Sequence, residues 1–173
     1  MSTTIRDVVS LAFLERNETL VISGSIHSDM NELARALAKK AEQDGASVLA
    51  FKAGALFEFL ARERAGKKVM KDEDIHPARA SLLLVENFGM KKLTLSQTKD
   101  FCDLMLERLG RSSTIITSPY LLIEWVSHIP ESEEGGLLFN SLLKDARQVV
   151  IGGRPKRSEK KPAPTIQPMQ ACG

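Results

Sequence analysis

The 173-residue sequence has few cysteines and lacks any long apolar run. Its two cysteines, Cys102 and Cys172, fall in a predicted helix and in the last three residues, so they do not form a disulfide framework. No stretch approaches the roughly 20 apolar residues that a membrane span needs, and the N-terminus has no signal-peptide core. We therefore expect a soluble protein of the reducing cytoplasm that does not contact a membrane.

Aromatic residues are also scarce, and the net charge is small. One Trp and one Tyr give no support to stacking on nucleic-acid bases, and a formal net charge of +2 does not by itself indicate a nucleic-acid partner. Hydrophobic residues make up 43% of the chain and charged residues 27%, as in ordinary globular proteins. A chain of this length can bury a core of its own, so we expect one domain followed by a tail.

Short apolar segments alternate with segments of helical periodicity along the chain. The predicted strands are residues 19–23, 46–51, 80–86, 113–118 and 148–151. The predicted helices are residues 5–16, 28–44, 53–64, 95–109, 121–129 and 136–146. This alternation is typical of an α/β protein whose parallel sheet is covered by helices on both faces. In such a sheet the ligand crevice lies beyond the carboxyl ends of the strands.

The composition changes near the C-terminus. From Gly152 onward Lys, Arg, Pro and Gln prevail and little is left to bury. We therefore expect a core domain over residues 1–153 and a basic, Pro-containing flexible tail over residues 154–173.

Four segments, in order and with compatible spacing, resemble motifs of the IstB-like and DnaC-type AAA+ family. FLERNETLVISG (Phe13–Gly24) is similar to the lead into the phosphate loop, and LLLVENFGMKKLT (Leu82–Thr94) to the Walker B strand and its following loop. LGRSSTIITSPYLLIEW (Leu109–Trp125) resembles the sensor strand, and LLFNSLLKDARQVVIGG (Leu137–Gly153) resembles the closing helix and strand. Members of this family are ATP-binding helpers of insertion-sequence transposases, related to loaders of the replicative helicase.

The resemblance covers roughly residues 10–155. It implies the three-layer P-loop NTPase fold, an α/β sandwich with a five-stranded parallel sheet in the order 5-1-4-3-2, helices on both faces and no lid domain.

The segment similar to the phosphate loop keeps the family's length but not its chemistry. A phosphate loop uses glycines for close backbone approach, a lysine for the β- and γ-phosphates and a Ser/Thr hydroxyl for Mg²⁺. The resemblance places these functions at Gly24, Asp29, Met30 and Asn31, where only the first glycine remains. Because Asp29 and Glu32 have the spacing of a capping box, we expect the Asp29 carboxylate to accept the free N–H groups of the helix start and to repel a triphosphate.

The other motifs that the resemblance implies carry similar replacements. Glu86 and Asn87 stand where the family has the Mg²⁺-binding Asp and the acidic residue that polarises water. Pro119 replaces a sensor Asn, and Ser141 stands at the position of an Arg that stabilises charge. We therefore expect a protein that is not an enzyme and that uses no cofactor. A metal site is not expected either, because the three histidines lack metal-ligand spacing: His27, His76 and His128.

Two loops and the tail carry clusters of basic residues. These clusters are Lys67 and Lys68 before the third strand, Lys91 and Lys92 after it, and Arg154, Lys156, Arg157, Lys160 and Lys161 in the tail. Such clusters contact nucleic-acid phosphates electrostatically and without sequence preference, so DNA contact is one interpretation. A solvated, solubilising surface is the alternative.

The sequence therefore favours a pseudo-ATPase adaptor, a protein that keeps the AAA+ shape in order to bind a partner. The expected partner is a transposase, a helicase or another AAA+ subunit, in transposition, replication or the maintenance of mobile elements or plasmids. Oligomerisation is compatible with this interpretation. Two alternatives stay open: an atypical nucleotide-binding protein that uses Glu86 and main-chain groups, and a small basic DNA-binding accessory protein.

Overall fold

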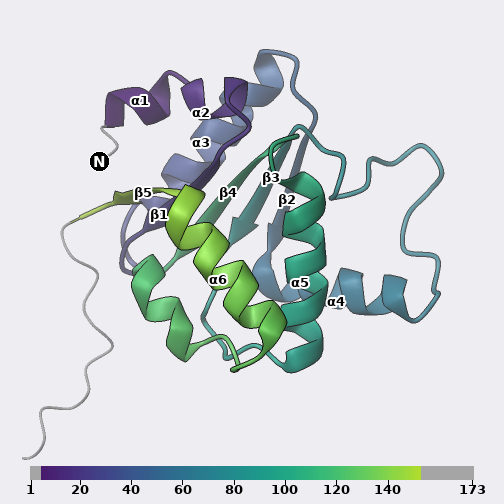
Figure 1. Ribbon diagram of the computed structural model, residues 1–173. Coiled ribbons are helices and arrows are strands. Elements are labelled where there is room, and N and C mark those ends of the chain that lie inside the picture. The colour runs from purple at the N-terminus through teal and green to yellow at the C-terminus, as the bar shows by residue number, and fades with distance from the viewer. Residues whose placement is uncertain (1–4, 153–173) are drawn as a thin grey trace, which may run out of the picture.

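A computed structural model of the protein describes residues 5–152, so the predicted tail and its basic residues lie outside the described part. The strands are β1 (Thr19–Ser23), β2 (Val48–Lys52), β3 (Leu82–Glu86), β4 (Ser113–Ser118) and β5 (Arg147–Val150). All neighbouring strands are parallel, and their order is β2-β3-β4-β1-β5, as Figure 1 shows. This order confirms the predicted 5-1-4-3-2 arrangement.

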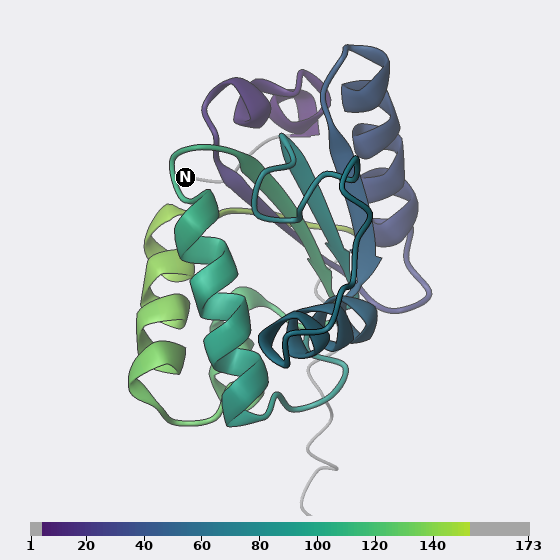
Figure 2. The ribbon, with the colours of Figure 1, turned by 90° about the vertical axis from the view of Figure 1, so that its right-hand side faces the viewer.

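Helices cover both faces of this sheet, which confirms the predicted three layers (Figure 2). One face carries α1 (Ile5–Val9), α2 (Ala12–Glu15) and α3 (Met30–Gln43). The other face carries α4 (Ala53–Arg64), α5 (Leu95–Arg108), the 3₁₀ helix η1 (Leu122–Ser127) and α6 (Glu133–Asp145). Alternate residues of the central strands enter the two cores: Leu82 and Leu84 pack toward α3, and Leu83 and Val85 pack toward α4 and α5.

Several element boundaries differ from the sequence prediction by one to three residues, and three of the helices differ in ways that have a visible cause. The predicted helix over residues 5–16 is two short helices, because Leu11 adopts a left-handed φ of 57°. The predicted helix over residues 121–129 is the shorter 3₁₀ helix η1. The helix after β1 begins at Met30 rather than at Ser28, since Ser25–Ser28 closes a turn through a 2.9 Å hydrogen bond from Ser28 N to Ser25 O.

A buried arginine holds the amino-terminal edge of the sheet together. The guanidinium of Arg108, at the end of α5, donates to the carbonyl oxygens of Pro77, Ala80 and Ser113 and to the Thr114 hydroxyl. Burial lowers the pKa of Arg108 to about 10, because the charged form loses its hydration. These contacts fasten the end of the long segment between α4 and β3 to the start of β4. Within residues 5–152 no helix is both long and apolar enough to cross a membrane.

Candidate functional site

Most of the predicted site residues meet at the carboxyl edge of the sheet. The segments that follow β1, β3 and β4 are joined there by backbone hydrogen bonds, from Gly24 N to Ser118 O (3.2 Å) and from Phe88 N to Thr117 O (2.8 Å). Gly24, Asn87 and Pro119 therefore lie on adjacent segments, as the parallel topology predicts. The edge is the candidate site because it gathers residues that are far apart in the sequence.

The loop after β1 is folded tightly onto itself. A Cβ atom at Gly24 would lie 2.4 Å from Ser28 Oγ and 3.2 Å from the carbonyl oxygen of Ile151, so only glycine fits without rearrangement. The Ser28 hydroxyl in turn donates to Ser25 O over 2.6 Å. Glycine is thus required at position 24 by close packing against Ser28 and the backbone of Ile151.

The predicted role of Asp29 is wrong. Asp29 is the N-cap residue of α3, but its side chain makes no capping hydrogen bond. Its backbone angles, φ −79° and ψ 17°, differ from the extended conformation from which an N-cap side chain reaches the free N–H groups of the first turn. The hydroxyl of Ser28 accepts from Met30 N instead, over 3.4 Å. The helix start therefore does not hold the Asp29 carboxylate as an internal anion.

Met30 is fully buried at the start of α3. It belongs to the apolar core between α3 and the sheet, together with Val8, Leu20 and Ala34. A phosphate loop needs an amine at this position that extends toward the β- and γ-phosphates. The side chain present is an uncharged thioether inside the core.

Asn31, Asn87 and Thr117 form a closed set of hydrogen bonds between α3, β3 and β4. Asn31 Nδ2 donates to Asn87 Oδ1 over 2.9 Å, and the Thr117 hydroxyl donates to Asn31 Oδ1 over 2.6 Å. The same hydroxyl accepts from Asn87 N over 2.9 Å. Asn87 adopts a left-handed φ of 61°, a conformation that asparagine tolerates better than most residues. Asn31 stands at the position that the resemblance equates with the Mg²⁺-binding hydroxyl, and Asn87 at that of the acidic residue that polarises water. These two side chains are hydrogen-bonded to each other.

Glu86 makes a bidentate (two-pronged) ion pair with Arg35 of α3. Arg35 Nε lies 2.6 Å from Glu86 Oε1, and Arg35 Nη2 lies 2.8 Å from Glu86 Oε2. The Glu86 side chain is 7% exposed and that of Arg35 is 59% exposed, so the pair sits at the rim of the site. Because the carboxylate accepts hydrogen bonds from the guanidinium and attracts its charge, the pKa of Arg35 is raised above its usual value.

Arg35 and Thr117 are the site residues that the sequence analysis missed, and a sequence signal existed only for Arg35. Arg35 lies four positions after Asn31, so the two side chains share one face of α3, beside the buried stripe that contains Met30 and Ala34. That spacing was the available signal. The spacing indicates Arg35 only when one asks which residue of this helix faces the carboxylate at the end of β3.

Pro119 follows a serine that connects the end of β4 with the loop after β3 and with η1. The buried hydroxyl of Ser118 donates to Phe88 O over 2.7 Å and accepts from Trp125 Nε1 over 3.1 Å and from Tyr120 N over 3.2 Å. Trp125 is fully buried, and the centroid of its ring lies 4.3 Å from that of Phe88. The strand end that precedes Pro119 is thus held by side chains of the core.

The remaining predicted residues lie outside these hydrogen-bonded contacts. Ser141 lines a narrow groove between α5 and α6 beside Thr19, the first residue of β1, and therefore lies toward the opposite edge of the sheet from Glu86. Lys91 and Lys92 are exposed on the loop after β3. Lys67 and Lys68 belong to the segment between α4 and β3, which projects from one flank in Figure 1, and Lys68 pairs with Asp72 at 3.4 Å. The predicted basic residues of the tail lie outside the described residues: Arg154, Lys156, Arg157, Lys160 and Lys161.

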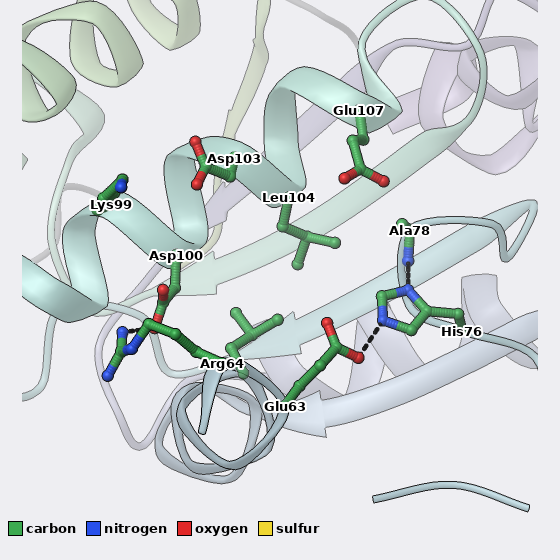
Figure 3. A pocket seen from close by; sticks show the side chains of 10 residues that line it. Glu63, Arg64, His76, Ala78, Lys99, Asp100, Asp103, Leu104 and Glu107 are labelled. Atoms are coloured by element: carbon green, nitrogen blue, oxygen red, sulfur yellow. Dashed lines mark hydrogen bonds and ion pairs between the residues drawn. The ribbon is translucent and has the colours of Figure 1, made fainter. Parts of the chain in front are cut away.

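A separate cavity of about 380 Å³ lies between α4, α5 and the segment that precedes β3 (Figure 3). His76 Nδ1 accepts from Ala78 N over 3.0 Å, so Nε2 carries the proton that is shared with Glu63 Oε2 over 2.6 Å. Arg64 pairs with Asp100 across the same cavity. Its histidine and two of its carboxylates are thus engaged internally, and in residues 5–152 no three His, Cys, Asp or Glu side chains are grouped to hold a metal ion.

The sheet order and the position of α3 after β1 define the class as a P-loop nucleotide-binding fold of the AAA+ type. The crystal structure of the DnaC helicase loader matches 87% of this chain and 93% of its own, with a TM-score of 0.65 and 19% sequence identity. A replication initiator DnaA bound to AMPPCP and single-stranded DNA matches 84% of this chain and 44% of its own, with a TM-score of 0.65 and 17% identity. At these identities the likeness concerns the fold.

The chain belongs to the family of IstB-like ATP binding proteins, whose family model matches residues 2–163. A putative insertion sequence ATP-binding protein of Sinorhizobium fredii is 26% identical over 145 residues, which are 84% of this chain and 59% of the relative. A putative ATP-binding protein in an insertion sequence of Mycobacterium tuberculosis is 22% identical over 93% of this chain and 64% of its own. The chain thus spans about three fifths of the length of such relatives.

Replacing Met30 with lysine is expected to destabilise the protein rather than to create a phosphate contact. The ammonium would be placed in an apolar core with no acidic partner, so Met30→Lys should lower the free energy of unfolding by about 3 to 5 kcal/mol. Met30→Leu keeps the volume and should cost less than about 1.5 kcal/mol. Urea titration followed by circular dichroism measures both. A Met30→Lys protein of unchanged stability that is stabilised by Mg–ATP would contradict the assignment of Met30 to the core.

Proposed function

We propose that this protein is a pseudo-ATPase adaptor, which keeps the AAA+ shape without hydrolysing ATP. The observation that carries the proposal is the bonding of Asn31 and Asn87 to each other and to Thr117. In a working site these two positions act on Mg²⁺ and on the attacking water. Here their polar atoms are directed at one another.

The chemistry of the neighbouring residues supports the same conclusion. Phosphoryl transfer depends on positioned cations and on a group that orients the nucleophile. Met30 offers no charge, and an amide such as Asn87 cannot accept a proton as a general base. Both oxygens of Glu86 are engaged by Arg35. This set of residues therefore offers neither a cation for the phosphates nor a free carboxylate for a metal ion.

The function that remains for such a scaffold is the binding of another macromolecule. The relatives are described as insertion sequence ATP-binding proteins, and one structural neighbour is a helicase loader. We therefore propose a transposase, a helicase or another AAA+ subunit as the partner class, in transposition, replication or mobile-element maintenance. A cytoplasmic location stays a prediction from the sequence.

Calorimetric titration with Mg–ATP tests the loss of nucleotide binding. We expect no saturable heat, which corresponds to a dissociation constant weaker than about 1 mM. The same nucleotide solution titrated into a P-loop ATPase with an intact lysine serves as the control. Micromolar binding would overturn the proposal and favour the atypical nucleotide-binding alternative.

DNA contact is a second candidate, favoured by the exposed pair Lys91 and Lys92 at the carboxyl edge. If these lysines contact phosphates, the variant Lys91→Glu/Lys92→Glu should bind DNA more weakly, and the slope of log affinity against log salt should fall by about 1 to 2. The comparison variant is Lys67→Glu/Lys68→Glu, which makes the same reversal of charge in the other predicted basic loop and so shows whether any loss is specific to Lys91 and Lys92. Fluorescence anisotropy with a labelled oligonucleotide measures both variants. Equal affinity and slope in the wild type and the Lys91/Lys92 variant would count against this contact.

A further inference from the structure

We propose that Arg35 is a built-in cation that takes the electrostatic place of a divalent metal at the end of β3. The inference rests on the proposed function and deepens it, because it identifies how the site is held closed without a ligand. Glu86 is the carboxylate that the sequence assigns to the metal-binding position, and it is buried. A buried carboxylate needs a compensating charge, and Arg35 supplies one through two hydrogen bonds.

The position of Arg35 in the helix makes this substitution effective. Asn31 and Arg35 are one turn apart on the same face of α3, so the first two turns of the helix contact the strand ends at two points. Arg35 holds Glu86 of β3, and Asn31 holds Asn87 and Thr117. In a working P-loop protein the nucleotide and its metal lie between these same elements. Here side chains connect them directly.

The geometry also argues against a shared site in which a metal ion and Arg35 coexist. A guanidinium that donates to both oxygens of a carboxylate occupies one lone pair on each, so the carboxylate cannot bind a cation through both oxygens from that side. The positive charge of the guanidinium also repels a second cation placed beside Glu86. Arg35 therefore determines that the site takes neither Mg²⁺ nor the nucleotide that the metal would accompany.

A double-mutant cycle between Arg35→Met and Glu86→Gln tests the proposal. In the otherwise native protein, Arg35→Met should lower the folding equilibrium constant about tenfold, because it leaves a buried carboxylate without its partner. In the E86Q background the same substitution should lower that constant less than about threefold. Arg35→Lys keeps the charge but loses the two-pronged geometry, so its effect should be intermediate. Chemical denaturation of the four proteins of the cycle, together with Arg35→Lys, gives these ratios.

The exposed pair of Arg62 and Glu58 on α4, whose atoms lie 2.9 Å apart, is the matched control. Arg62→Met should change the folding equilibrium constant less than about twofold, because exposed i,i+4 pairs contribute little. Hydrogen exchange is the second readout. Amides of residues 31–37 should exchange about tenfold faster in Arg35→Met than in the wild type, whereas those of α5 should keep their rates.

Equal losses from Arg35→Met in the native and E86Q backgrounds, or unchanged exchange over residues 31–37, would overturn the proposal. Either result is distinguishable from a failure of the proposed function. Nucleotide binding by the wild type would remove the pseudo-ATPase assignment whatever the cycle gives. An absent coupling would remove only the role of Arg35, and a protein that binds no nucleotide would still fit the adaptor.

Discussion

The buried hydroxyl of Thr117 is the group on which the arrangement of the carboxyl edge depends. It accepts from the backbone of Asn87 and donates to the side chain of Asn31, so one oxygen connects β4, the end of β3 and the start of α3. A buried hydroxyl with both roles satisfied stabilises its surroundings, whereas an unsatisfied one is costly. This contact orients the side chain of Asn31, whose amide in turn donates to the side chain of Asn87.

The ion pair of Arg35 and Glu86 extends the same contact along α3. Under the proposed function, the two interactions together replace ligand-mediated contacts with intramolecular ones, while the buried side chain of Met30 packs α3 against the sheet. The consequence for function is that the closed arrangement needs neither nucleotide nor metal. A protein of this kind presents a constant surface, which suits an adaptor better than a switch that cycles with ATP.

The fold was predictable from the sequence to a greater extent than the site. Apolar runs such as Leu82–Glu86 and the helical stripe from Met30 to Ala41 determine the sheet and its layers, because burial depends on periodicity that is visible locally. Asp29 was assigned wrongly although it is the N-cap residue of α3, because its backbone angles differ from the extended conformation in which a side chain caps the first turn. Arg35 and Thr117 were missed because their roles depend on partners 51 and 86 residues away in the chain.

The central claim is that the protein's own side chains occupy the positions where a nucleotide would bind. The most direct measurement is a titration of the ¹⁵N-labelled wild type with millimolar Mg–ATP, followed by the backbone amide signals of Gly24–Asn31 and of Glu86–Phe88. If side chains of the protein close the site, these signals should keep their positions throughout the titration. Saturable shifts confined to these two segments would contradict the claim, because they would place the nucleotide in the site that Asn31, Asn87 and Arg35 are inferred to close.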